Sequence, residues 1–310
     1  MIRHLITPSH SMLTTAIVAC ALVVLLAVYP ESEAQARELL AVRVTVAKPV
    51  VDGTVDDEVW QRAKTLPLTV ERKLPPNKGA AGKAWLQAAY TDTHLYVVLS
   101  WEDDAPDVSH KTWTWNTSRS AYEEGSDRED MAAIAFELEG PFTADMLSPV
   151  EAIWDVWHWK AFRTNPQGYA TDKTHHYLRS IPNFKANEHT ANDGQPIWIA
   201  RPEDKGASAE ASRPAPGKRT HDKLPQFLPT TPSGSAADVR AKGQWAKGRW
   251  TVEFARSLNT GHEDDAVFRP DRCHPMAVAT FNHTGNMDKA SDLIHLRFDH
   301  PSAPASCTDH

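Results

Sequence analysis

Short segments of alternating apolar and polar residues recur along the chain, and this period of two is typical of β-strands with one buried face. Residues 42–46 alternate valine with polar neighbours, and residues 250–254 repeat the pattern with Trp, Val and Phe. Residues 131–138 and 276–281 predict two further strands. Because helical periodicity is scarce and turn residues are frequent, we predict an all-β fold, an antiparallel β-sandwich or barrel.

Two segments make this prediction specific. Residues 84–90 and 94–101 are apolar runs separated by Thr91-Asp92-Thr93, which predicts a β-hairpin. Residues 154–160 read Trp-Asp-Val-Trp-His-Trp-Lys, so an extended chain carries large groups on both faces. We therefore expect this strand to be covered on each side.

The chain divides into segments of different composition. Residues 1–36 have the basic, apolar and small-residue order of a secretory signal, and we expect cleavage after Ala36, with an uncleaved membrane anchor as the alternative. Residues 37–300 are long enough for one large β domain. Within it, residues 201–242 are rich in Pro, Ser, Ala, Gly and charge, which predicts a flexible polar insertion. Residues 301–310 resemble a loose tail.

Charge and cysteine content narrow the function classes. The formal net charge of −7 disfavours nucleic acid or an anionic membrane surface as the main partner. After signal cleavage Cys273 and Cys307 remain, and in an oxidising compartment they either pair or stay free. No Cys-x-x-Cys-His sequence occurs, so covalent attachment of a c-type haem is excluded.

Several motifs, taken in order, resemble a known family. They are Val51-Asp-Gly-Thr-Val-Asp-Asp-Glu-Val-Trp60, Asp155-Val-Trp-His-Trp-Lys160, Asn165-Pro-Gln-Gly-Tyr169 and Trp250-Thr-Val-Glu-Phe-Ala-Arg256. Together they resemble the ethylbenzene dehydrogenase-related haem-binding domain, the gamma-subunit type of periplasmic molybdenum enzymes. The first motif also occurs in family 9 carbohydrate-binding modules and other DOMON-like sandwiches, whereas the Trp-rich motif is more specific.

The resemblance implies an immunoglobulin-like or DOMON-like sandwich that holds one non-covalent haem b, with a methionine and a lysine as axial ligands. For the thioether we favour Met146, in a loop, over Met131, which opens a strand. For the nitrogen we favour Lys289, with His283 or His295 as alternatives. We expect the haem in an apolar slot between the two layers of the sandwich.

Other residues have a functional and a structural interpretation. His158 either binds a haem propionate or iron, or is a histidine of the core. Lys160 either pairs with a propionate or extends to solvent. The tryptophans at 113, 115, 157 and 159 are sugar-stacking residues or, more often at such spacing, core. We interpret His175-His176 as a solvated loop, and the acidic residues 127, 129 and 130 as a charged turn.

A haem iron with two protein ligands has no position for substrate and transfers electrons. The sequence therefore predicts a periplasmic haem-binding subunit with no catalytic residues of its own. Its expected partners are molybdopterin and iron–sulfur subunits, or another periplasmic redox protein. The alternative is a carbohydrate-binding module without haem.

Overall fold

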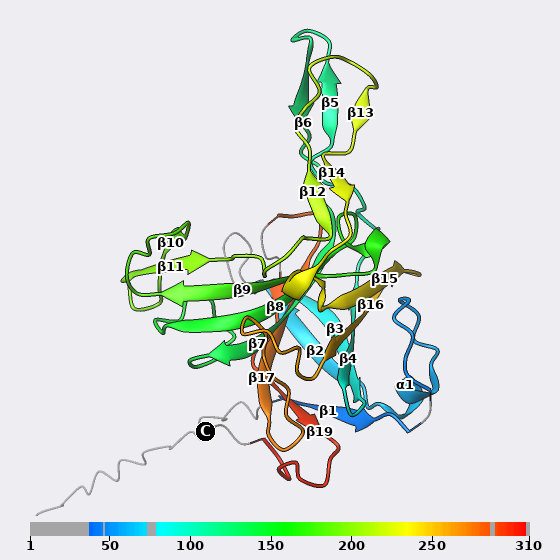
Figure 1. The fold of residues 1–310 in the computed structure, drawn as a ribbon, viewed down its shortest axis with the longest axis vertical. Coiled ribbons are helices and arrows are strands. Elements are labelled where there is room, and N and C mark those ends of the chain that lie inside the picture. The colour runs from blue at the N-terminus through cyan, green and yellow to red at the C-terminus, as the bar shows by residue number, and fades with distance from the viewer. Residues whose placement is uncertain (1–36, 46, 73–78, 286–288, 308–310) are drawn as a thin grey trace, which may run out of the picture. The chain divides into compact units, whose positions relative to one another are not determined.

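The fold was analysed in a computed structural model, which describes residues 37–45, 47–72, 79–285 and 289–307. Nearly all its regular structure is β, and the main sheet has 14 strands. This sheet folds into two facing layers, so the predicted all-β sandwich is confirmed (Figure 1). No helix among the described residues is long and apolar enough to cross a membrane.

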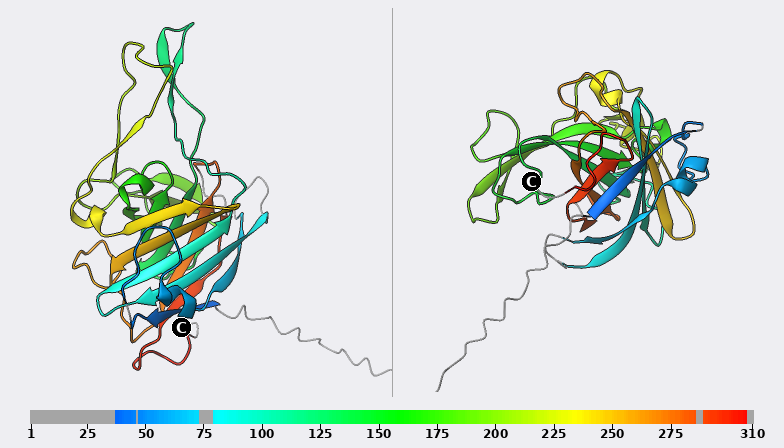
Figure 2. Two further views of the ribbon diagram at one scale, coloured as in Figure 1. Left: turned by 90° about the vertical axis from the view of Figure 1, so that its right-hand side faces the viewer. Right: turned by 90° about the horizontal axis from the view of Figure 1, so that it is seen from below.

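The first layer runs in the order β2, β3, β4, β16, β15 and stands in front in the left view of Figure 2. Its strands are β2 (Leu66–Glu71), β3 (Ala81–Tyr90), β4 (His94–Glu102), β16 (Arg249–Ser257) and β15 (Arg240–Trp245). The β3–β4 pair is the predicted hairpin, with Tyr90 opposite Leu95. The pattern of apolar residues therefore located this hairpin correctly.

The second layer runs in the order β17, β7, β8, β9, β11, β10. Its strands are β17 (His274–Phe281), β7 (Met131–Glu139), β8 (Ala152–Lys160), β9 (Thr171–Leu178), β11 (Pro196–Ala200) and β10 (Asn187–Thr190). β18 (Lys289–Ala290) connects β17 to β2. β1 (Arg37–Arg43) pairs in parallel with β3 and with β19 (Ile294–Phe298), an exception to the predicted antiparallel pattern.

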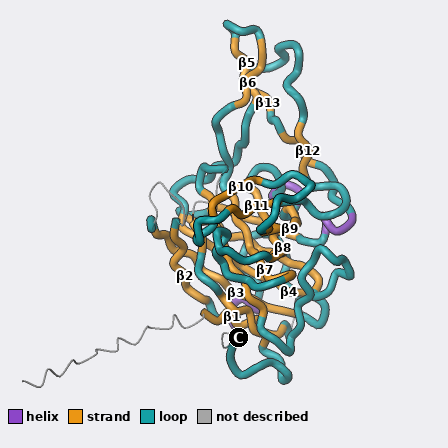
Figure 3. The backbone as a smooth tube through the Cα atoms, turned by 90° about the vertical axis from the view of Figure 1, so that its left-hand side faces the viewer, coloured by secondary structure: helices purple, strands orange, loops and turns teal. Residues whose placement is uncertain are grey.

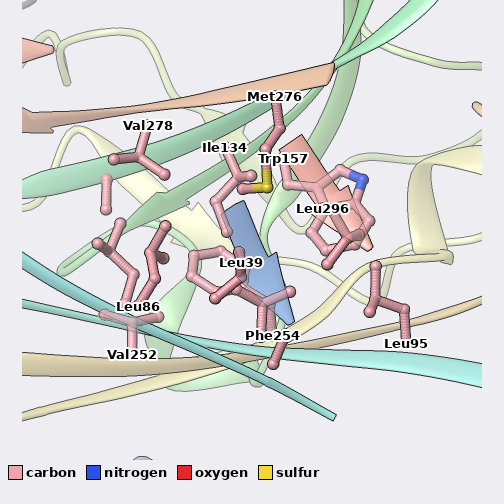
Figure 4. Close-up of a cluster of buried hydrophobic side chains, with 14 of the residues drawn as sticks. Leu39, Leu86, Leu95, Ile134, Trp157, Val252, Phe254, Met276, Val278 and Leu296 are labelled. Carbon is pink, nitrogen blue, oxygen red and sulfur yellow. The ribbon is translucent and has the colours of Figure 1, made fainter. Parts of the chain in front are cut away.

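Side chains from both layers fill the space between them (Figure 4). Leu86, Val252 and Phe254 of the first layer face Ile134 and Trp157 of the second, and all five are almost inaccessible to solvent. Each fully buried side chain of this size contributes about 1.5–3 kcal/mol to stability. The interlayer space is thus a packed core, and the expectation of an apolar haem slot there is wrong.

The Asp-Gly turn at the start of the chain is held by one buried carboxylate. Glu253 of β16 accepts hydrogen bonds from the backbone N–H groups of Asp52 and Gly53, at 3.0 and 2.8 Å, and from Trp60 Nε1 at 3.0 Å. Gly53 has a φ of +89°, which a residue with a Cβ adopts only with strain. Trp60 lies in α1 (Glu58–Arg62), so Glu253 joins this short helix to the first layer.

Residues 201–242 contain more regular structure than their polar composition predicts. They contribute β12 (Glu210–Ser212), β13 (Lys223–Leu224), β14 (Phe227–Pro229), the 3-10 helix η2 (Gly234–Ala237) and the start of β15. β12 pairs with β14, and β13 adds to the hairpin of β5 (Trp113–Asn116) and β6 (Ala121–Glu124), visible at the top of Figure 3. The mobility of this segment stays a prediction.

A disulfide joins Cys273, which precedes β17, to Cys307 in the C-terminal segment. The sequence left this pairing open. The bond spans 34 residues and ties the segment after β19 back to the second layer.

We expect the Cys273→Ser, Cys307→Ser double variant to lose about 2–4 kcal/mol of unfolding free energy, because the crosslink restricts the unfolded chain. Guanidinium titration of both proteins measures this difference. A reductant should reproduce the loss in the parent protein and have no effect on the variant. Equal stability of parent and variant would contradict the assigned contribution.

Candidate functional site

A cavity of about 530 Å³ opens on the face of the second layer that points away from the core. Its floor is made by Met131 of β7, His158 and Lys160 of β8, and Lys173 of β9. The remaining lining comes from three other parts of the chain and from Gly285. Residues before β7 supply His110, Lys111 and Arg128, the turn after β8 supplies Arg163, and the 201–242 segment supplies Glu203, Glu210, Ser212 and Phe227.

Strand alternation determines which residues form the floor. In β8, Trp157 and Trp159 point into the interlayer core, so His158 and Lys160 point to the opposite face. Lys160 is directly opposite Met131 in the neighbouring strand, and residues paired in this way share a face. The prediction that this strand is covered on both sides is confirmed, since Trp154 is also buried on the outer face.

Two nitrogen groups meet on the floor. Lys173 Nζ lies 2.8 Å from His158 Nδ1. Burial, with Lys160 as the next contribution, lowers the pKa of Lys173 to about 7, and burial also lowers the pKa of His158 well below its usual value. Burial therefore makes the neutral amine of Lys173 accessible near neutral pH, beside an imidazole whose charged form is also disfavoured.

Met131 supplies the one thioether of the cavity lining. Its side chain is 2% exposed, and Sδ accepts a contact from Arg163 Nη2 at 3.5 Å. A soft thioether and nitrogen side chains thus line the same cavity, and both are donor types that bind transition metals.

Ion pairs hold the walls of the cavity together. Arg163 contacts Glu129 and lies with Nε 3.3 Å from Glu210 Oε2, while Lys160 Nζ contacts Glu210. Glu129 is fully buried and accepts the backbone N–H of Phe162 and of Arg163 as well. The predicted charged turn does precede β7, and its Glu129 is buried there and paired with Arg163.

The lining has more cationic than anionic side chains. Lys111, Arg128, Lys160 and Arg163 face two carboxylates, Glu203 and Glu210. Charge-assisted hydrogen bonds from such groups favour carboxylate or phosphate ligands.

His110 and Lys173 are cavity residues that the sequence analysis did not identify. Burial lowers the pKa of His110 to about 3, and its ring packs against Phe227 at 5.5 Å between centroids. No local motif identifies either residue, because the cavity is assembled from segments that are separate in the sequence. Lys173 could have been found from its place in β9, one strand away from the Trp-rich motif.

The favoured ligand candidates from the sequence lie outside this cavity. Met146 is partly buried against the outer-face apolar cluster but does not line the cavity. Lys289 is opposite Thr280, and its side chain packs near Gly82 of β3. The structure therefore does not bring Met146 and Lys289 together at the cavity, whereas it does place Met131, His158 and Lys160 there.

The two histidine alternatives also lie elsewhere. His283 Nδ1 is 3.1 Å from Asp107 Oδ1, and the side chain is largely exposed. His295 is paired with Glu38 in the β1–β19 ladder. Neither residue lines the cavity.

Three other interpretations can be compared with the structure. Trp157 and Trp159 are fully buried in the core, as expected from their spacing, and cannot stack on a sugar. Trp113 and Trp115 are partly exposed in β5, so the core interpretation is wrong for these two. His175 and His176 belong to β9, and burial lowers the pKa of both, so their assignment to a solvated loop is wrong. Asp130 is buried and accepts Trp250 Nε1 at 3.0 Å.

Together, these observations define a β-sandwich domain with a charged cavity on the outer face of its second layer. The model of the ethylbenzene dehydrogenase family matches residues 57–291, and the chain belongs to this family. In this family the domain is of the non-catalytic subunit type.

Solved structures with a similar fold include a family 9 carbohydrate-binding module from Caldicellulosiruptor kristjanssonii in complex with cellotriose. It is 9% identical, with 88% of this chain and 100% of that chain covered and a TM-score of 0.38. A putative carbohydrate-binding protein from Bacteroides uniformis is 7% identical, with 85% and 100% covered and a TM-score of 0.42. No curated protein matches the sequence.

The lowered pKa of Lys173 predicts a pH dependence of stability in the ligand-free protein. Between pH 7 and about 10.5 the unfolded chain keeps the lysine proton that the folded chain has released, so folding becomes more favourable as the pH rises. Below pH 7 both states carry the proton and this contribution is constant. The Lys173→Met variant should lack this increase in unfolding free energy between pH 7 and about 10.5.

Urea unfolding at pH 7 and pH 9.5 measures the effect as the difference between parent and variant. The exposed Lys83 provides a matched control, since Lys83→Met should leave the pH dependence unchanged. If Lys173→Met and Lys83→Met have the same pH dependence as the parent, Lys173 is an ordinary lysine.

Proposed function

We propose that this chain binds one haem b in the outer-face cavity and transfers electrons for a molybdenum oxidoreductase. The observation that carries the proposal is that one cavity floor holds a buried thioether, Met131, and an amine, Lys173, whose pKa burial lowers to about 7. Membership of the ethylbenzene dehydrogenase family supports the same function.

The described residues fit a haem group. The cavity volume of about 530 Å³ is within the usual range of about 300–1,000 Å³ for cofactor sites. The imidazole Nε2 of His158 is buried and has no described hydrogen-bond partner. The cations Lys111 and Arg128 suit the two propionates, which are anionic.

Lys173 is our choice for the nitrogen ligand because burial already disfavours its protonated form. His158 holds the amine in place by accepting one of its hydrogens at Nδ1, as partners of metal ligands commonly do. Met131 supplies the sulfur, and its contact with Arg163 fixes the position of the side chain. Bound haem would contribute a one-electron iron couple, tuned by ligand type and burial.

The cellular setting is part of this proposal. The signal-like residues 1–36 support export to the periplasm, and the Cys273–Cys307 disulfide is typical of an oxidising compartment. Molybdopterin and iron–sulfur subunits are the partners that the family suggests.

Haem titration of the purified chain tests the proposal. We expect one haemin per chain, a low-spin Soret band that shifts on dithionite reduction, and the pyridine haemochrome of haem b. A protein that binds no added haemin contradicts the function, and in that case sugar binding on a glycan array would support the carbohydrate-binding alternative.

Paired variants test the ligands. Met131→Leu and Lys173→Met should each abolish the low-spin spectrum. Both substitutions approximately preserve the volume of the side chain. Met146→Leu and Lys289→Met, at the positions favoured from sequence, should leave the spectrum unchanged. If the second pair alters the spectrum and the first does not, haem binds elsewhere.

A further inference from the structure

A second cluster of charged residues lies at one end of the interlayer core, separate from the cavity. Arg256 of β16 is 1% exposed, and its Nη1 contacts Asp155 of β8 and lies 2.8 Å from Asp265 Oδ1. Arg256 therefore connects the two layers through carboxylates from each side. Asp172 of β9 and Asp204 extend the cluster, since Asp204 N donates to the Asp172 backbone oxygen at 3.2 Å.

The guanidinium does not satisfy the carboxylates around it. Asp172 is fully buried, and neither of its side-chain oxygens accepts a hydrogen bond from any described residue. Oδ1 of Asp155 is in the same condition, whereas the carboxyl of Asp204, which is 7% exposed, interacts with the carboxyl of Asp172. Buried polar groups without a hydrogen-bond partner are rare in native structures, because removing an unpaired polar group from water costs free energy.

The charges do not balance either. Asp155, Asp172, Asp204 and Asp265 lie around one guanidinium, which leaves a formal excess of three negative charges. The imidazole of His262, 3.9 Å from Asp265 Oδ2, is a second basic group at the edge of the cluster. Burial raises the pKa of Asp172 well above its usual value and that of Asp204 to about 8, as expected when no positive partner compensates. Protons or a cation must neutralise the excess.

Geometry favours a cation. One oxygen each from Asp155, Asp172 and Asp265 lies within 4.8 Å of the other two. This span is about twice a Ca²⁺–oxygen distance of about 2.4 Å, so a single ion can contact all three. Ca²⁺ accepts six to eight oxygen ligands in flexible geometry, whereas Mg²⁺ keeps several waters, for which a closed site has little room.

We propose that Asp155, Asp172 and Asp265 bind one Ca²⁺ ion that, together with Arg256, fastens the two layers of the sandwich. The site is independent of the outer-face cavity and of any haem in it. The oxygens that Arg256 leaves without a partner on Asp155 and Asp172 are the ones available to the ion.

The first experiment measures metal content and stability of the unmodified chain. We expect about one calcium per chain by plasma mass spectrometry after dialysis against calcium, and none after EDTA treatment. Saturating Ca²⁺ should raise Tm by roughly 5 °C or more over the EDTA-treated protein, with a smaller effect of Mg²⁺. No bound calcium and no shift in Tm would overturn the proposal and leave protons as the neutralising species.

Variants localise the effect. Asp172→Asn keeps the shape of the side chain and removes one ligand charge, so it should weaken calcium binding at least about tenfold and reduce the Tm shift at limiting Ca²⁺. Asp104→Asn, at an exposed aspartate, should bind calcium as the parent does. Equal calcium affinity of Asp172→Asn and the parent would place the ion elsewhere and overturn this assignment, even if calcium stabilises the chain.

Discussion

The packing of Trp157 and Trp159 into the space between the two layers determines where this protein can bind a ligand. Both indoles are fully buried, and with the apolar residues of β3, β4 and β16 they leave no slot between the sheets. Because successive residues of a strand point to opposite faces, the same packing directs His158 and Lys160 outward. The chemically useful side chains of β8 therefore gather on the outer face.

An outer sheet face is usually wet, and the 201–242 segment changes this environment. Glu210 and Phe227 cover the floor and contact Lys160 and His110. Glu203 of the same segment forms a β-bridge with Lys173, and burial disfavours the charged forms of Lys173 and His158. A polar insertion thus creates the conditions under which an amine can act as a metal ligand.

The fold was predictable from sequence where one strong local pattern decided the outcome. The β3–β4 hairpin and strands β7, β8, β16 and β17 follow from alternation, and Trp-rich β8 was correctly expected to be covered on both faces. The site was less predictable. Lys173 and His110 carry no motif, and Glu129, read as part of a charged turn, is buried only because Arg163 and backbone N–H groups from a distant loop surround it. Such partners are fixed by tertiary structure, which alternation does not encode.

The central claim is that haem binds on the outer face of the second layer, between Met131 and Lys173. The position of iron in crystals of the haem-loaded protein, located by anomalous diffraction at the iron edge, tests this claim most directly. We expect one iron peak within bonding distance of Met131 Sδ and Lys173 Nζ. A peak beside Lys289 or between the two layers would contradict the account.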